Sequence, residues 1–388
     1  MLEPFELYSH EIDADPFPGY ARLRDEAPCY WSESAELWIL TRYDDVANAA
    51  QDWETFSSLR GNLVDEIPGR SGGTLGTTDP PHHDRLRALA QAAFTRKAVE
   101  DLVPRTKAIV DAAIEGIEGK KHFDFVSDFS SRVTVGTIFA LLGLPERDPA
   151  ETRQKVVLSI STDKKARGRN PELNEAFTEL TRFLADEIAK RRADPADDLI
   201  TALAEAEVDG ERLTDREVML TTTMFVVAGV ESLSSFMSVF ALNLAEHDEA
   251  RRRIAAQPDL MPQAIEESLR FNTSAQRFKR TATRDVELHG QVISEGDAVV
   301  LAYGAANRDE RKFPEAERFD IDRNPRGHLG FGTGKHFCIG SNFARMVTAV
   351  AVNRLLAQVP DFELARREFD WVPSSNFRSP VSLPLVRS

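Results

Sequence analysis

The sequence is poor in cysteine. Only Cys29 and Cys338 occur among 388 residues, so disulfides cannot form a framework, and the cysteines alone cannot supply the four ligands of a structural zinc site. Such a composition fits a reducing compartment, and we expect a cytoplasmic protein.

Basic residues are outnumbered. The chain has 48 Lys and Arg against 63 Asp and Glu, a formal net charge of −15. Because an acidic protein repels phosphate groups, this balance argues against nucleic acid or an anionic membrane surface as a partner.

Long apolar segments and linkers are also missing. The chain does not open with a basic segment and an apolar core, and nowhere do eighteen apolar residues follow one another, so neither a signal peptide nor a membrane span is expected. Length alone would allow about two to three domains. Without a Pro/Ser/Gly-rich linker or an internal repeat, we expect residues 1–388 to form a single, mostly α-helical domain with small β-sheets.

Local patterns place the main elements. Residues 30–31 and 37–40 are typical of two short strands around a polar turn, and a second strand pair is expected within 286–300. Helices are expected near residues 133–142 and 172–192. Residues 61–79 are rich in Gly, Ser and Thr, which predicts a long, irregular, functional loop.

The longest helical pattern covers residues 214–247. It opens with Thr214-Asp-Arg-Glu217, a capping box, and would extend about 50 Å at ~1.5 Å per residue. Its apolar centre contains Glu231 and Ser232, and a carboxylate there is costly without a partner or a task. Two small residues just before them, Ala228 and Gly229, would let a ligand press against the helix, and they favour a local widening that admits water.

One cysteine lies in a distinctive segment, Phe331 to Gly340, which reads Phe-Gly-Thr-Gly-Lys-His-Phe-Cys-Ile-Gly. An amphipathic helical pattern follows directly, so Cys338 should lie at a helix N-terminus, where the dipole and free N–H groups favour a thiolate. Gly332 and Gly334 permit backbone angles closed to other residues, and Gly340 leaves room for a flat ligand. A haem whose iron binds the sulfur fits this loop; the alternative is a buried, inert cysteine after a turn.

This segment resembles the cysteine-ligand loop of the cytochromes P450, Phe-Gly-x-Gly-x-His-x-Cys-x-Gly. The resemblance extends over nearly the whole chain, with four separated motifs in the family's order. It implies the P450 fold, with haem b (iron protoporphyrin IX) between the long central helix and this loop. Cys338 would then be the iron ligand, and Gly340 and Ala228 would contact the haem.

Further cofactor contacts follow from the same resemblance. His83 and Arg87 are four residues apart after Asp79-Pro80-Pro81 and share a helix face. By themselves they could belong to a solvated basic stripe, whereas the family pattern assigns both to a haem propionate. Arg280 and His336 would bind the same groups.

The resemblance also implies a structural network behind the haem. Glu267 and Arg270 match the family's Glu-x-x-Arg pair, although such pairs are usually exposed when they occur alone. The third member is either Arg318 or Arg323.

The implied activity is a haem-thiolate monooxygenase, which inserts one oxygen atom of O2 into an organic substrate by hydroxylation or O-dealkylation. A small to medium hydrophobic substrate is expected, and the pocket candidates are Met224, Val227, Ala275, Phe278 and Pro380. Arg277 leaves open a carboxylate-bearing aromatic. A basic stretch at Lys164, Lys165, Arg167 and Arg169 is expected on a solvated loop over the entrance, with attraction of an anionic substrate as the alternative.

The sequence departs from the family at the catalytic pair. Glu231-Ser232 stands where an acid followed by Thr is usual, so the hydroxyl that could donate during oxygen activation is kept without the methyl that restrains it. Glu231 is expected to relay protons from solvent; the alternative is that it is locked to a nearby arginine as a structural ion pair. The strand before Arg280 also lacks the family's common proline around Ser274–Gln276.

Electrons are expected from a separate ferredoxin or flavodoxin-type donor with its reductase, since the chain has neither a Rossmann-type Gly-x-Gly-x-x-Gly nor a four-cysteine cluster motif. Basic residues near the cysteine loop, Lys335, Arg87 and Arg85, would attract that donor. Two other classes remain open: a haem-thiolate reductase or isomerase, and a non-catalytic haem or ligand-binding protein.

Overall fold

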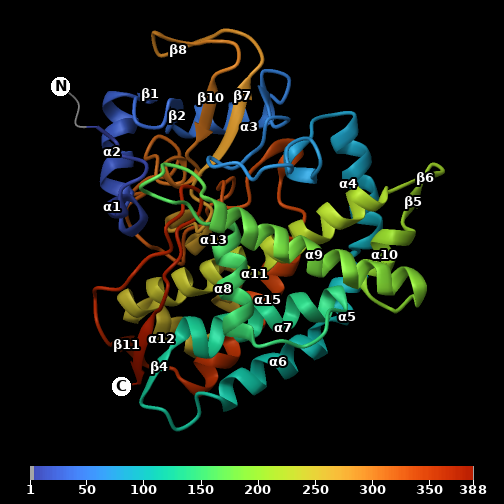
Figure 1. Ribbon diagram of the computed structural model, residues 1–388. Coiled ribbons are helices and arrows are strands. Elements are labelled where there is room, and N and C mark those ends of the chain that lie inside the picture. The colour runs from blue at the N-terminus through green and yellow to red at the C-terminus, as the bar shows by residue number, and fades with distance from the viewer. Residues whose placement is uncertain (1–3, 388) are drawn as a thin grey trace.

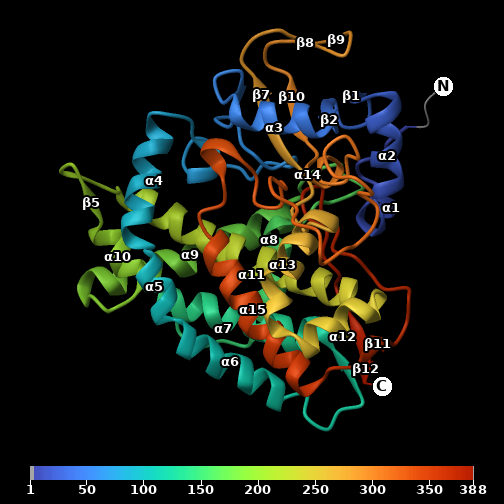
Figure 2. The ribbon, with the colours of Figure 1, turned by 180° about the vertical axis from the view of Figure 1, so that it is seen from behind.

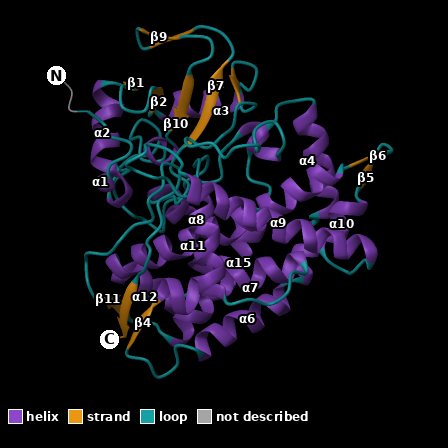
Figure 3. Cartoon of the chain, in the orientation of Figure 1, coloured by secondary structure: helices purple, strands orange, loops and turns teal. Residues whose placement is uncertain are grey.

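A computed structural model describes residues 4–387 of the chain (Figure 1). Helices account for about 52% of it, and the strands form small sheets, as Figure 3 shows. The prediction of a mostly α-helical fold with small β-sheets is therefore confirmed.

The elements alternate irregularly along the chain. The α-helices are α1 (His10–Ala14), α2 (Phe17–Glu26), α3 (Tyr43–Gln51), α4 (His82–Ala93), α5 (Arg96–Asp101), α6 (Val103–Glu115), α7 (Ser131–Leu142), α8 (Pro149–Ile160), α9 (Pro171–Ala193), α10 (Leu199–Glu205), α11 (Asp215–Glu246), α12 (Asp248–Ala256), α13 (Met261–Phe271), α14 (Tyr303–Ala306) and α15 (Ser341–Gln358). The strands are β1 (Cys29–Ser32), β2 (Leu37–Leu40), β3 (Phe56–Ser57), β4 (His122–Asp124), β5 (Glu207–Val208), β6 (Glu211–Arg212), β7 (Phe278–Ala282), β8 (Val286–Leu288), β9 (Gln291–Ile293), β10 (Ala298–Leu301), β11 (Phe362–Leu364) and β12 (Pro384–Arg387).

The largest sheet has the strand order β1-β2-β10-β7-β3. The predicted strands at 30–31 and 37–40 are its β1 and β2, which pair antiparallel, and β2 runs parallel to β10. Since side chains alternate along a strand, Phe278 and Arg280 of β7 project to the same face of this sheet.

The predicted central helix is α11. Its capping box is present, with the Glu217 amide donating to Thr214 Oγ1 at 3.3 Å and the Thr214 amide donating to Glu217 Oε2 at 2.7 Å. Figures 1 and 2 show α11 between a layer containing α8 and α9 and another containing α13 and α15. This central helix therefore contacts most of the helical core.

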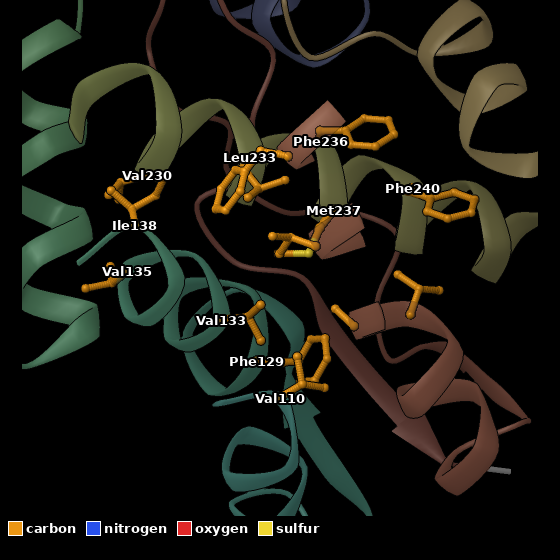
Figure 4. Close-up of a cluster of buried hydrophobic side chains, with 14 of the residues drawn as sticks. Val110, Phe129, Val133, Val135, Ile138, Val230, Leu233, Phe236, Met237 and Phe240 are labelled. Atoms are coloured by element: carbon orange, nitrogen blue, oxygen red, sulfur yellow. The ribbon is translucent and has the colours of Figure 1, made fainter. Parts of the chain in front are cut away.

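The close packing of α7 on α11 explains one of the small residues in α11. Figure 4 shows Val133 and Ile138 of α7 facing Val230, Leu233 and Met237 of α11. A Cβ added to Gly229 would lie 2.3 Å from Ile138 Cδ1. The expected widening of α11 at this point is wrong, because α11 is a continuous α-helix; a π-helical turn lies instead at Phe125–Ser130, before α7.

Two segments, Phe125–Leu142 and Asp215–Glu246, are long and apolar enough to cross a membrane by length and composition. Their apolar windows are 72% and 78% buried inside the protein. Burial in the core accounts for their composition.

The loop at residues 61–79 is irregular apart from a 3-10 turn at Leu75–Thr77, as predicted. Asp65 anchors it by accepting hydrogen bonds from Tyr8 at 3.0 Å and from Thr162 at 2.7 Å. Arg216 of α11 donates to the Gly69 carbonyl at 2.9 Å. The loop is thus tied to the chain's N-terminal region, to the segment after α8 and to the central helix.

Candidate functional site

The cysteine loop has the predicted backbone. Gly332 and Gly334 both have φ of +68°, in the left-handed region that favours glycine. The Cys338 amide donates to the Phe331 carbonyl at 3.0 Å, which closes the loop. Gly340 is the N-cap of α15, and a Cβ there would meet only Cys338 Sγ, at 3.9 Å. The loop therefore presents its sulfur beside an unobstructed stretch of backbone.

The protonation of Cys338 is a balance of opposing effects. Burial raises the pKa of its thiol, while the Gly340 N–H, Arg87 and Arg345 lower it. The helix-terminus effect predicted from the sequence is thus present, but burial outweighs it. A thiol that coordinates a metal is deprotonated outright, so iron would supply the remaining stabilisation of the thiolate.

A cavity of about 320 Å³ opens above this loop. Eleven predicted residues line it, from the cysteine loop, α4, α11 and β7 and the segment before it: Arg87, Met224, Val227, Ala228, Ser232, Ala275, Phe278, Arg280, His336, Cys338 and Gly340. Most of the other lining side chains are apolar, among them Leu63, Ile67, Phe94, Ile160, Phe177 and Phe377. The fold thus brings distant segments together around one apolar cavity.

Basic side chains gather at one part of this wall and directly behind it. His83 and His336 stack edge to face with ring centroids 4.7 Å apart, and His336 Nε2 lies 3.1 Å from Ser58 Oγ. Arg87 Nη1 donates to the Lys335 carbonyl at 3.2 Å, and Arg280 Nη1 to its neighbour's carbonyl at 2.8 Å. The side-chain donors that remain could therefore bind an external anion.

His83 provides the test of cofactor fit. It does not line the cavity, but it is fully buried, its Nδ1 lies 3.0 Å from Asp84 Oδ1, and its Nε2 has no hydrogen-bond partner in the described part of the chain. Burial lowers the pKa of His83; burial, Arg280 and His83 lower the pKa of His336 to about 3. A buried imidazole nitrogen without a partner, close to the Arg87 and Lys335 cations, matches a group that carries carboxylates. The residues present fit haem.

The two residues of the predicted catalytic pair point to different environments. Ser232 lines the cavity, and its hydroxyl donates to the Ala228 carbonyl one turn earlier. Glu231 does not line it: this carboxylate is buried, lies 3.1 Å from Arg153 Nε and accepts from Ser235 Oγ at 2.9 Å. The geometry matches the alternative in which Glu231 is locked to an arginine, because both carboxylate oxygens face buried partners away from the cavity.

The Glu-x-x-Arg network is resolved in favour of Arg323. Arg270 contacts Glu267 through two hydrogen bonds of 2.8 and 2.7 Å, and both side chains are 0% exposed. Arg323 Nε adds a contact of 3.2 Å to Glu267 Oε1. Arg318 contributes only its carbonyl oxygen, which accepts from Arg270 at 3.0 Å.

Two expectations about the pocket are wrong. Pro380 does not line the cavity, since it pairs with Trp371 in an isolated bridge, and Phe377 of the same turn lines it instead. Arg277 is buried near Tyr20 and does not reach the cavity.

The basic stretch at 164–169 is only partly solvated. The Lys164 side chain is only 8% exposed and lies 2.8 Å from Asp13, and Arg169 donates to the Ser159 and Leu173 carbonyls at 3.0 and 2.7 Å. Of the four basic residues in this stretch, Lys165 and Arg167 are exposed. It therefore does not form the expected solvated basic patch.

Sequence patterns missed several polar residues around the site. Asn62, Arg70 and Thr74 line the cavity from the loop at 61–79, and Arg153 of α8 holds Glu231. Irregular loops carry no periodicity that would identify inward-facing residues, so only the Gly/Ser/Thr-rich composition pointed to this region.

Comparison with known proteins identifies the family. The family model described as Cytochrome P450 matches residues 154–366. Cytochrome P450 107B1 of Saccharopolyspora erythraea is 35% identical over 387 residues, which covers 94% of this chain and 93% of that protein. The chain belongs to the cytochrome P450 family.

Other P450s agree in sequence and fold. The mycinamicin IV hydroxylase/epoxidase of Micromonospora griseorubida is 34% identical, covering 90% of this chain and 89% of that protein. Among solved structures, the bacillaene polyketide synthase P450 PksS of Bacillus subtilis has a TM-score of 0.91 at 29% identity, with 99% of this chain and 100% of that chain covered. CYP109Q5 of Chondromyces apiculatus has a TM-score of 0.89 at 31% identity, with 100% and 99% covered.

Membership defines the general activity. As a P450 the protein is a haem b-containing oxidoreductase of the monooxygenase class, which uses O2, an organic substrate and electrons from a redox partner. It is of the soluble bacterial type.

Proposed function

We propose that Cys338 would bind the haem iron and that the haem would be held between α11 and the cysteine loop. The observation that supports this is that the wall of one cavity combines Cys338 and Gly340 with Ala228 of α11. His83, Arg87, Arg280 and His336 would hold the propionates, with His83 Nε2 gaining the partner it lacks.

Haem, when bound, would supply the activation of dioxygen, and electron density from a thiolate ligand favours cleavage of the O–O bond. The protein's part is binding, orientation and control of protons. Apolar side chains of α11, β7 and the loop at 61–79 exclude water and hold the substrate. Ser232, the hydroxyl of the catalytic pair that lines the cavity, is the proposed donor during oxygen activation, while Glu231 fixes α8 to α11 through Arg153.

The substrate is proposed to be a small to medium hydrophobic molecule, hydroxylated or O-dealkylated. The relatives differ in this respect: one similar structure, CYP109E1 of Bacillus megaterium, was solved with testosterone, and another, P450BioI, with a fatty acid on acyl carrier protein. The mainly apolar lining of this cavity supports the hydrophobic class.

The electron donor is proposed to be a separate ferredoxin or flavodoxin-type protein with its reductase, in the cytoplasm, acting on a single P450 domain of residues 1–388. Relatives that match 99% of this chain over 96% of their own length support the single domain. Of the basic residues expected to attract the donor, Lys335 is paired with Asp84 at 2.8 Å and Arg85 with Glu217 at 2.8 Å. Their contribution to steering should therefore be small.

The assignment of Cys338 as the iron ligand is tested with the Cys338→His variant. The ferrous carbon-monoxide complex of the wild-type protein should show the strongly red-shifted Soret band of a thiolate, and the variant should lose it while still binding haem. A variant with an unchanged band would refute Cys338 as the ligand.

A further inference from the structure

Arg70 is a charged side chain of the cavity that the haem does not account for. The charged residues among the described lining are Arg70, Arg87 and Arg280, and the latter two belong to the proposed propionate site. No Asp or Glu contributes to the wall along residues 4–387. A ligand in this cavity therefore meets one guanidinium and no carboxylate.

The Arg70 side chain is already held in place. Its Nε donates to Glu66 Oε1 at 2.8 Å and its Nη2 to Glu66 Oε2 at 2.9 Å, a two-point pair in which the side chains are only 13% and 14% exposed. Nη2 also donates to Asn62 Oδ1 at 2.6 Å, and the Leu63 amide donates to Glu66 Oε2 at 3.1 Å. Because three hydrogen bonds fix the guanidinium and a fourth holds its partner Glu66, little further ordering is needed to bind a ligand.

The pair leaves one nitrogen of Arg70 for another partner. Nη1 takes part in none of these hydrogen bonds, and Arg70 itself lines the cavity. The nearby wall is apolar: Leu63 and Ile67 of the same loop pack with Ile160 and Phe177. An acceptor atom of a ligand would find a donor at Arg70 and mostly hydrocarbon around it.

The charge of this donor is compensated by Glu66. The other charged side chains close to Glu66 are Lys279, Arg169 and Asp65, and none of them lines the cavity. Lys279 Nζ donates to the Val64 carbonyl at 3.4 Å, Arg169 donates to backbone carbonyls, and Asp65 is occupied by Tyr8 and Thr162. A second carboxylate beside the Arg70–Glu66 pair would be desolvated next to a like charge, which is unfavourable.

We infer that the substrate is a neutral, largely apolar molecule with a carbonyl oxygen that accepts a hydrogen bond from Arg70 Nη1, and that Glu66 disfavours the corresponding free acid. This inference deepens the proposed function and rests on it. It makes Arg70 and Glu66 specificity-determining residues of the cavity.

The test is a spectral binding titration of the haem-loaded protein with three probes of equal chain length: a fatty acid methyl ester, the free fatty acid and the alkane. Wild-type protein should bind the ester about five- to tenfold more tightly than the alkane, the value of one hydrogen bond, and more tightly than the acid. Arg70→Gln should remove the preference for the ester. Arg216→Gln, which removes a cation that contacts the same loop but does not line the cavity, should keep it.

Glu66→Gln separates recognition from a merely structural role. Removal of the compensating charge should raise the affinity for the acid about tenfold and change that for the ester less than twofold. Unchanged acid binding in Glu66→Gln, tighter binding of acid than ester by the wild type, or equal binding of ester and alkane would overturn the inference. The ferrous carbon-monoxide spectrum of each sample distinguishes failure of this inference from failure of the proposed function. A missing thiolate band would refute the proposed function.

Discussion

Gly229 of α11 lies directly against Ile138 of α7, so closely that a Cβ at this glycine would be 2.3 Å from Ile138 Cδ1. The contact sets how near the two helices approach beneath the cavity, to which both residues contribute. Glycine in mid-helix costs ~1 kcal/mol relative to alanine, and close packing explains why it is present.

Gly229→Ala should therefore destabilise the protein. The clash outweighs the gain in helix propensity, with an expected net loss of about 1 kcal/mol or more in denaturant unfolding. In an Ile138→Val background, which lacks Cδ1, the same substitution should cost less. Equal costs in the two backgrounds would show that this contact is not the cause.

Glu231→Gln tests the structural role of the Arg153–Glu231 pair. The substitution leaves the Arg153 guanidinium buried without its counter-ion, so we expect a loss of about 3 kcal/mol, measured by urea unfolding. Adding Arg153→Met should recover part of it. A proton relay predicts the reverse pattern: unchanged stability, slower turnover and a larger solvent isotope effect.

Ser232→Ala should affect coupling rather than stability. The Ser232 hydroxyl lines the cavity and donates only to a carbonyl of its own helix. The free energy of unfolding should therefore change by less than about 0.5 kcal/mol. More hydrogen peroxide should be released per NAD(P)H consumed. Ser238→Ala is the matched control, because Ser238 makes the same bond to a carbonyl one turn earlier, at 2.8 Å, but does not line the cavity; a similar rise in peroxide there would refute the role of Ser232.

Glu267→Gln should be far more damaging than Arg318→Ala. Glu267 and Arg270 are fully buried, and Glu267 accepts from both Arg270 and the partly buried Arg323. Neutralisation of Glu267 should therefore cost at least about 3 kcal/mol and reduce haem content. Arg318 contributes only backbone to this network, so Arg318→Ala should change stability by less than about 0.5 kcal/mol. Comparable losses in both variants would contradict the assignment of Arg323 as the third member.

Glu266 should make the folding stability of the protein depend on pH under acidic conditions. Burial raises the pKa of its carboxyl, but hydrogen bonds from Arg345 and His328 outweigh burial and lower it to about 2. A depressed folded-state pKa gives stability that is present above the unfolded value and lost as pH falls toward 2. Wild type should exceed Glu266→Gln by about 2 kcal/mol at neutral pH, and by progressively less below pH of about 4.5. A difference that stays constant down to pH of about 3 would refute this coupling.

The features that could be predicted from the sequence are local. The capping box at Thr214, the left-handed glycines and the helix after Cys338 each depend on residues within a few positions of one another. The cysteine loop then indicated the family, and through it the residues that converge on the cavity.

The features that could not be predicted depend on distant parts of the chain. Arg153, the partner of Glu231, lies 78 positions before it. Arg318 and Arg323 occupy the same irregular segment, and only the folded path shows which side chain reaches Glu267. Arg70 enters the cavity from a loop without periodicity, where no pattern marks the side chains that face inward.

The pairing of β2 with β10 also has a consequence for the protein during its synthesis on the ribosome. Residues 41–297 separate these strands, and at about 5 to 20 residues per second a ribosome needs roughly 10 to 50 s to make them. During this time the edge of β2 that will meet β10 has no strand partner from its own chain. The strand with Arg280 and the loop with Cys338 are made in the final third of translation, so the candidate haem site cannot be complete until synthesis is nearly finished.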